Sequence, residues 1–191
     1  MASYYHKGVI NIRLFIAINF PDGVLDKISG IIEKARENST SGRFVDRQNL
    51  HLTLEFLGKV EPGRLFAIKK IMDGIEQPLF KMRLAGIGRF KRPEGDIYWI
   101  GVVDNPALFD LQRRLHEALE AEGFPLEQKK YTPHITIGRK VRLKEGFSIC
   151  SELDGMAVHV KKVDLMRSEL TKKRAIYTVL YSKPLEERRK E

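Results

Sequence analysis

The feature of this sequence that most constrains its fold is a layout that occurs twice. In each half, a strand-like segment precedes an amphipathic helix, and a later strand carries the pattern His-x-Thr. The segments are residues 12–18, 24–35 and 51–53 in the first half and 96–103, 106–122 and 134–136 in the second. Little residue identity accompanies the layout, so it predicts two related lobes with approximate two-fold symmetry rather than a proven duplication.

Turn and cap residues delimit these segments. Asn105 is suited to cap a helix whose first residue is Pro106, and Gly123 is suited to end that helix. In the first half, the polar run Ser39-Thr40-Ser41-Gly42 is expected to end the helix, and a short strand at 43–45 should follow. Both halves therefore have clear local boundaries.

The remaining segments complete an α+β prediction. A helix is expected over 62–76, and strands are expected over 79–87, 156–166 and 174–181. Alternating strands that follow one another in sequence favour antiparallel sheets. We expect two pseudo-symmetric lobes of antiparallel sheet, with helices packed outside and an active-site cleft between the lobes. The expected organisation is an N-terminal extension at 1–12, a single bilobal domain at 13–185 and a charged tail at 186–191.

Composition restricts the setting and the partners. The chain has 191 residues, 42% of them hydrophobic, which is enough for one sizeable core. The sequence contains no apolar run of about 18 residues, so no membrane span is expected, and no apolar segment of the secretory kind is evident. Cys150 is the single cysteine, which excludes an intrachain disulfide, and we expect it to be packed inside a monomeric, cytoplasmic protein. The net charge of +9 favours a polyanionic partner.

The two His-x-Thr strands are the strongest candidates for chemistry. Side chains alternate along a strand, so His51 shares a face with Thr53, and His134 shares a face with Thr136. The chain has five histidines and six threonines. Random placement would give only about 0.16 matches to the pattern, and two are present. A lone strand histidine is more often a hydrogen-bonded core residue, but a matched pair favours catalysis.

No metal and no cofactor are expected. Metal centres take three or four ligands, and neither motif has a further ligand at the required spacing. Glu55 is expected on the strand face of His51, but it stands alone. The run Gly86-Ile87-Gly88-Arg89 lacks the length and the lysine of a phosphate-binding loop, and a strand-end loop is expected. The other histidines lack a partner threonine. We expect His6 to lie in a flexible terminus, His116 on the polar side of a helix and His159 at an ordinary strand position.

Two imidazoles suit the cleavage of a phosphodiester. One group must take a proton from the attacking oxygen, while another protonates the leaving oxygen. Histidine, with an unperturbed pKa of about 6.5, can perform either task at neutral pH. Threonine hydroxyls and a basic side chain can hold the phosphoryl oxygens. The sequence therefore predicts a bell-shaped pH–rate curve that reports on the pair.

The motifs resemble those of the two-histidine phosphoesterases. The residues that carry the resemblance are 13–18 (Arg-Leu-Phe-Ile-Ala-Ile), 51–58 (His-Leu-Thr-Leu-Glu-Phe-Leu-Gly) and 133–139 (Pro-His-Ile-Thr-Ile-Gly-Arg). Within that group the sequence is most similar to the bacterial and archaeal RNA 2′,3′-cyclic phosphodiesterases, also called 2′-5′ RNA ligases. The resemblance extends from Arg13 to Arg139 and is looser in the C-terminal third.

The resemblance implies metal-independent hydrolysis of an RNA 2′,3′-cyclic phosphate end to a 2′-phosphate. It implies that His51 is the proton donor to the departing 3′ oxygen and that His134 is the proton acceptor that activates water. Thr53 and Thr136 would hold the non-bridging oxygens. The implied partner is RNA, tRNA halves included, and in some members a 5′-hydroxyl replaces water and a 2′-5′ linkage forms.

Other residues are substrate-binding candidates on physical grounds. Arg139 is placed to clamp phosphate, although a solvated arginine is an equal alternative. Phe15 is placed to stack on a terminal base beside Arg13, although ordinary packing is an equal alternative. Tyr131 and Trp99 are further stacking candidates.

Two alternative functions remain open at this point. One is an RNA-binding protein whose cleft holds RNA ends without turnover, in which case binding would follow the basic residues and not the histidines. The other is the same chemistry on a small cyclic nucleotide or on an NAD-derived cyclic phosphate. Mononucleotide and oligonucleotide substrates would separate the second alternative from the RNA enzyme.

Overall fold

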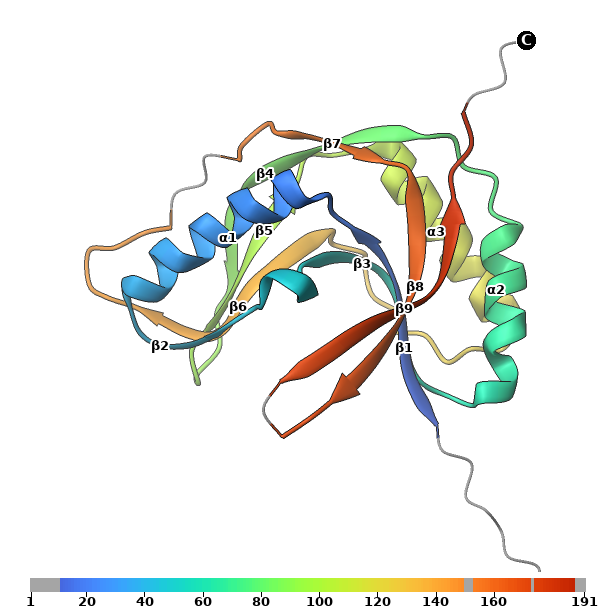
Figure 1. Ribbon diagram of the computed structural model, residues 1–191, viewed down its shortest axis with the longest axis horizontal. Helices are drawn as coiled ribbons and strands as arrows, with labels where there is room; N and C mark the ends of the chain where they lie inside the picture. Colours follow the sequence, from blue (N-terminus) through green and yellow to red (C-terminus); the bar gives the residue numbers. More distant parts are fainter. Residues whose placement is uncertain (1–10, 150–152, 173, 188–191) are drawn as a thin grey trace, which may run out of the picture.

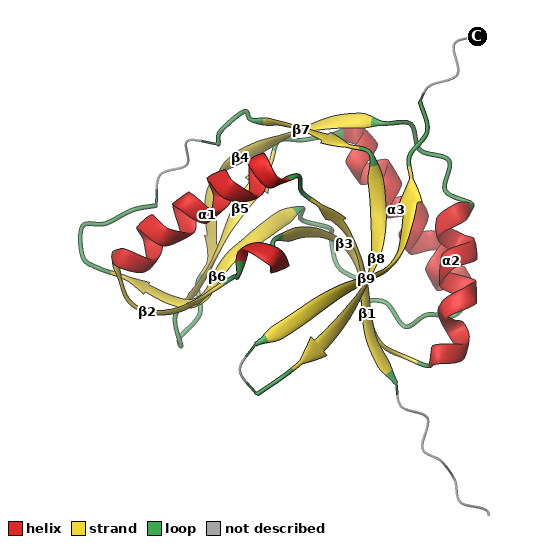
Figure 2. Ribbon diagram, viewed as in Figure 1, coloured by secondary structure: helices red, strands yellow, loops and turns green. Residues whose placement is uncertain are grey.

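The computed structural model describes residues 11–149, 153–172 and 174–187, so the expectations for His6 and Cys150 lie outside the described residues. Two antiparallel sheets form the fold (Figures 1 and 2). The first sheet has the order β3 (His51–Val60), β1 (Ile12–Asn19), β8 (Lys162–Leu170), β9 (Ala175–Pro184). The second has the order β2 (Ser39–Phe44), β6 (His134–Leu143), β5 (Asp96–Val102), β4 (Phe80–Phe90), β7 (Ala157–Val160). The α+β prediction with antiparallel sheets is confirmed.

Each helix of the repeat covers the sheet of the other half. Helix α1 (Asp22–Glu37) follows β1 of the first sheet but packs on β2 and β6 of the second. Helix α3 (Pro106–Ala121) follows β5 of the second sheet but packs on β3 of the first. Helix α2 (Leu65–Asp73), which is preceded by a 3₁₀ turn at Pro62–Arg64, packs against α3 and β9. Figure 1 shows α1 on one lobe and α2 and α3 together on the other.

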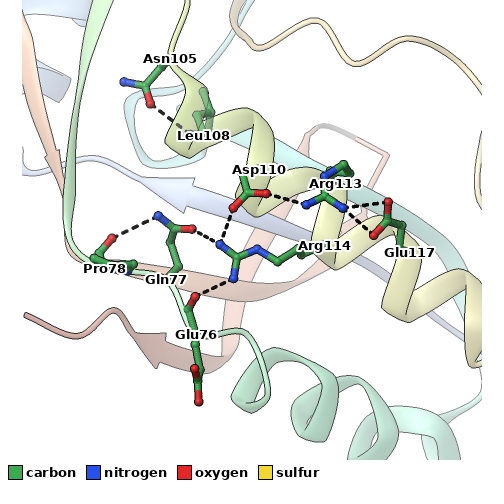
Figure 3. Close-up of polar contacts among 9 residues, drawn as sticks. All are labelled: Glu76, Gln77, Pro78, Asn105, Leu108, Asp110, Arg113, Arg114 and Glu117. Carbon is green, nitrogen blue, oxygen red and sulfur yellow. Dashed lines mark hydrogen bonds and ion pairs between the residues drawn. The ribbon is translucent and has the colours of Figure 1, made fainter. Parts of the chain in front are cut away.

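Helix α3 begins and ends at the residues expected from the sequence. The Asn105 side chain accepts a hydrogen bond from the backbone N–H of Leu108 at 3.0 Å (Figure 3), and Pro106 follows at the first helical position. Gly123, with φ of 79°, lies just beyond the helix. The buried stripe consists of Leu108, Leu111, Leu115 and Leu119. Burial of four leucines is the main contribution that holds α3 on its sheet.

An arginine ties α3 to the segment between α2 and β4. Arg114 donates to the backbone carbonyl of Glu76 and to the side-chain oxygen of Gln77, both at 2.7 Å (Figure 3). Asp110, one turn earlier, also contacts the Arg114 guanidinium. Because Gln77 is buried, these bonds satisfy polar groups that packing removes from water.

Three segments differ from expectation. The strand expected over 156–166 is two strands, β7 and β8, which lie in different sheets. The buried valines are even-numbered before the crossing, at Val158 and Val160, and odd-numbered after it, at Val163. The alternation of buried and exposed side chains is therefore shifted by one residue where the chain crosses between the sheets. The helix ends before residue 39, as expected, but the strand expected at 43–45 begins earlier, because the polar run at 39–42 belongs to edge strand β2. The run at 86–89 lies within β4 rather than in a strand-end loop.

Candidate active site

The two catalytic candidates line one pocket. It has a volume of about 220 Å³ and lies where β3 and β6 begin, with side chains from both sheets. His51, Thr53, His134 and Thr136 all border it. The convergence expected from the repeated layout is therefore present. The pocket is completed by Arg13, Phe15, Val45, Asn49, Phe56, Arg139, Ser168, Leu170 and Tyr177.

Both imidazoles are oriented in the same way. Nδ1 of His51 lies 2.7 Å from the backbone carbonyl oxygen of Asn49, and Nδ1 of His134 lies 2.7 Å from that of Thr132. A carbonyl can only accept, so Nδ1–H is the donor in each case, and in the neutral ring the lone pair is on Nε2. Nε2 of His51 contacts the Thr53 hydroxyl at 3.1 Å. Each ring is thus held with Nε2 as the atom that gains or loses a proton.

Matching β-bulges follow the two motifs. In β3, Thr53 is opposite Ala17 and Glu55 is opposite Ile16, so one extra residue lies between them. In β6, Thr136 is opposite Trp99 and Gly138 is opposite Tyr98, again with one extra residue. A bulge shifts the alternation of side chains by one position. The residue five positions after each histidine therefore joins the pocket, although a regular strand would turn it away: these residues are Phe56 and Arg139.

The bulge in β3 also corrects the expectation for Glu55. Its side chain does not share the face of His51; it is buried on the helix side of the sheet. There Nδ1 of His116 lies 2.7 Å from the Glu55 carboxylate, and Gln112 donates to the same oxygen at 3.3 Å. His116 is therefore a partner of a buried carboxylate rather than a solvated residue on the polar side of α3.

Aromatic rings support both histidines. Phe15 and Tyr177 lie 4.8 and 5.3 Å from the His51 ring, centroid to centroid. Phe90 and Trp99 lie 5.6 and 6.2 Å from the His134 ring. Phe15 is only 3% exposed, so its position favours packing behind His51 over stacking on a base. Trp99 lies over Gly88, where a Cβ atom would be 2.2 Å from the indole ring.

Arg13 and Tyr131, the other two substrate-binding candidates, occupy different positions. The Arg13 guanidinium lies 4.7 Å above the Phe56 ring at the edge of the pocket. Tyr131 does not border this pocket; its hydroxyl donates to the backbone carbonyl of Thr53 at 3.0 Å. Burial, together with the charge of Glu55, raises the pKa of the Tyr131 phenol. Tyr131 instead lines a neighbouring pocket that shares Thr53, Phe56 and His134 with the first.

Sequence reasoning missed several residues of the pocket. Tyr177 lies on β9 and Ser168 on β8, in the third of the chain where the sequence resemblance is weakest. Phe56 was missed because the bulge that turns it inward leaves no clear signal in the sequence. Tyr177 has no signal of its own in the sequence, because the same strand carries a second tyrosine, Tyr181, and several apolar residues.

The surroundings of His51 shift its pKa in the free protein. Burial lowers the pKa of His51, the carbonyl of Asn49 opposes that shift, and the neighbouring cation Arg139 and the nearby imidazole of His134 lower it further. A bound phosphate would introduce negative charge between these groups and would favour the protonated ring. The pocket is thus electrostatically suited to an anion.

Two absences hold for the residues that the structure describes. No cluster of three or more His, Cys, Asp or Glu side chains that could ligate a metal ion occurs among them. In the same part of the chain, no helix combines the length and the apolar character needed to cross a membrane.

Comparison with known families agrees with this geometry. The sequence model of the 2′-5′ RNA ligase superfamily matches residues 24–172. The chain belongs to this superfamily, and its expected resemblance to the two-histidine phosphoesterases is confirmed.

Two sequence relatives share the name RNA 2′,3′-cyclic phosphodiesterase, and two solved structures share the fold. An RNA 2′,3′-cyclic phosphodiesterase of Methanothermobacter thermautotrophicus is 33% identical over 181 residues, which cover 88% of this chain and 96% of the relative. The enzyme of the same name from Escherichia coli is 30% identical over 170 residues, with 88% and 93% covered. The crystal structure of E. coli LigT with 3′-AMP has a TM-score of 0.79 at 29% identity and covers 92% of this chain and 98% of its own. The structure of TT0787 from Thermus thermophilus has the same TM-score at 27% identity, with 93% and 100% covered.

Proposed function

We propose that this protein hydrolyses RNA 2′,3′-cyclic phosphate ends to 2′-phosphates by acid–base catalysis with two histidines and without a metal ion. The observation that supports the proposal most directly is that both imidazoles, each oriented through Nδ1 by a backbone carbonyl, line one pocket. Relatives at 33% and 30% identity are RNA 2′,3′-cyclic phosphodiesterases.

The proposed roles follow from the position of Nε2 in each ring. Protonated His51 donates its Nε2 proton to the 3′ oxygen as the P–O3′ bond breaks. Neutral His134 accepts, at Nε2, the proton of the water that attacks phosphorus. The product is a 2′-phosphate with a free 3′-hydroxyl, and the two histidines end in exchanged protonation states. Thr53, Thr136 and Arg139 hold the non-bridging oxygens and stabilise the developing charge.

We extend the proposal to a second reaction at the same site. If the 5′-hydroxyl of another RNA replaces water, the same displacement breaks the P–O3′ bond and joins the two strands through a 2′-5′ linkage, leaving a 3′-hydroxyl. The neighbouring pocket of about 420 Å³, which borders His134 and also contains Phe90, Arg92, Lys129 and Lys130, provides space on the side of the proposed base. Fragments of tRNA remain candidate substrates.

Product analysis on a defined RNA tests the function. A chelator-treated preparation is expected to convert a short RNA with a 2′,3′-cyclic phosphate end to the 2′-phosphate product, as identified by mass spectrometry and by resistance to a 3′-specific phosphatase. Adding a second RNA with a 5′-hydroxyl tests joining in the same assay. Formation of a 3′-phosphate, or loss of all activity on chelation, would contradict the proposed mechanism.

The lowered pKa of His51 predicts a difference between two pH profiles. The profile of kcat/KM reports on the two histidines of the free enzyme, so one of its two limbs should lie at a pKa below the usual value of about 6.5. The anionic substrate is expected to raise the pKa of His51 in the complex, so the profile of kcat should be displaced to higher pH. Steady-state rates between about pH 5 and 9 check this. Coincident profiles would contradict the proposed effect of substrate charge on His51.

A further inference from the structure

A second hollow adjoins the active-site pocket. It has a volume of about 840 Å³ and lies between strand β2 and the tip of the β8–β9 hairpin, two segments that Figure 1 shows facing each other. The residues shared by its lining and that of the active-site pocket are Val45, Asn49, Arg139, Leu170 and Tyr177. We call this hollow the basic groove. The shared residues make it a continuation of the site in which the phosphate is proposed to react.

The charge of the basic groove is strongly one-sided. Its lining contains five cationic side chains and one carboxylate, that of Asp46. The cations are Arg36, Arg43, Arg139, Lys172 and Arg174. Arg36 is partly neutralised by Glu33 at 3.4 Å. Such an excess on a concave surface attracts a polyanion.

The pairing of Arg43 with Arg139 is a second observation. These residues lie directly opposite each other on β2 and β6. Like charges at such positions repel and destabilise the sheet. The nearby carboxylate of Glu94 is engaged by Lys140 at 2.8 Å. An anion bound between the two guanidinium groups would relieve the repulsion.

The lining also offers surfaces for nucleobases. Leu170, at the end of β8, is 69% exposed although it is a large apolar residue. It lies where the active-site pocket meets the basic groove, as does Tyr177. Phe44 contributes a further aromatic ring. Stacking surfaces interleaved with cations are typical of sites for single-stranded nucleic acid.

We propose that the basic groove binds the RNA strand immediately 5′ of the cyclic phosphate. The inference rests on the proposed function, because it takes the reacting phosphate to lie between His51 and His134. The preceding phosphates would then contact Arg43 and Arg174 in the groove, beyond Arg139, which is proposed to hold the reacting phosphate. The protein would prefer an oligonucleotide to a cyclic mononucleotide, which cannot reach these cations.

The test compares two substrates with the same terminal nucleoside: a 2′,3′-cyclic mononucleotide and a hexaribonucleotide with a 2′,3′-cyclic end. The double variant Arg43→Ala/Arg174→Ala removes two cations of the groove. The double variant Arg43→Lys/Arg174→Lys keeps their positive charge. The control is Lys81→Ala/Arg83→Ala, which removes two exposed cations of β4 that line neither pocket. The ratio of kcat/KM for the hexamer to that for the mononucleotide should fall about tenfold or more in the alanine variant. It should fall less in the lysine variant and remain unchanged in the control.

Salt dependence and binding provide independent measurements. For the hexamer, the slope of log kcat/KM against log salt should become shallower by about 0.7 for each phosphate contact removed. A wild-type ratio near one, or equal losses of kcat/KM on both substrates in the alanine variant, would overturn the proposed binding of RNA in the groove and leave the proposed function intact. If the wild-type protein hydrolyses neither substrate, the proposed function fails. Fluorescence anisotropy with a labelled hexamer ending in a 2′-phosphate then tests RNA binding by the groove separately. Equal affinities of the wild-type protein and the alanine variant for this RNA would overturn the proposed role of the groove.

Discussion

Replacement of either His51 or His134 by alanine is expected to lower kcat on a 2′,3′-cyclic phosphate end by about 10²- to 10⁴-fold. Each substitution removes one of the two proton-transfer groups of the pocket and leaves the other in place. The double variant should be little worse than the more severe single variant, because the two groups act on one transition state. Single-turnover rates with enzyme in excess measure the chemical step directly.

His159→Ala is the matched control for these variants. His159 is exposed on β7 and lines neither the active-site pocket nor the basic groove, so its loss should leave the rate unchanged. Binding of a product oligonucleotide by the His51→Ala and His134→Ala proteins shows whether the pocket remains intact. Near-normal rates in both single variants would reject the acid–base assignment. They would mean that other groups of the protein carry out the proton transfers.

Gly88→Ala is expected to be the most disruptive single-methyl change next to the pocket. A Cβ atom at this position would lie 2.2 Å from two carbons of the Trp99 ring, so the indole must move. Overpacking of this kind costs about 1–3 kcal/mol of folding free energy. Trp99 adjoins the His134 ring, so its displacement should also misplace the proposed base and lower kcat by up to about 100-fold.

The chain provides its own control and its own probe for this substitution. Gly86 lies two residues earlier on β4, and a Cβ atom there would meet no atom within 4 Å. Trp99 is the sole tryptophan, so intrinsic fluorescence reports on its ring alone. We expect Gly88→Ala to change the emission spectrum, the denaturation midpoint and kcat together, and Gly86→Ala to change none of them strongly. Unaltered emission in Gly88→Ala would show that the close contact is relieved elsewhere.

The sequence was sufficient for the parts of the fold that depend on local rules. Strand alternation correctly placed each histidine on one face with its threonine, because the bulges begin only after Thr53 and Thr136. Capping chemistry located both ends of α3. The repeated layout indicated that two distant strands would meet, which the shared pocket bears out.

The missed features depend on long-range pairing. A bulge is set by the register between two strands, so the burial of Glu55 and the inward position of Phe56 could not be read from β3 alone. The same applies to strand β2, whose polar residues are ordered by pairing with β6 rather than by their own propensity. Tyr177 reaches the pocket only because β8 and β9 return to the first sheet beside β1.

The exchange of helices between the two sheets limits how the molecule can move and how it can be divided. Helices α1 and α3 each pack on the sheet of the other half, and buried side chains of both helices and both sheets form one continuous cluster. Parting the lobes would therefore expose apolar surface of both sheets, which disfavours a hinge that opens the mouth between the imidazoles. A chain severed between α2 and β4 would yield two fragments that remain incomplete until they recombine.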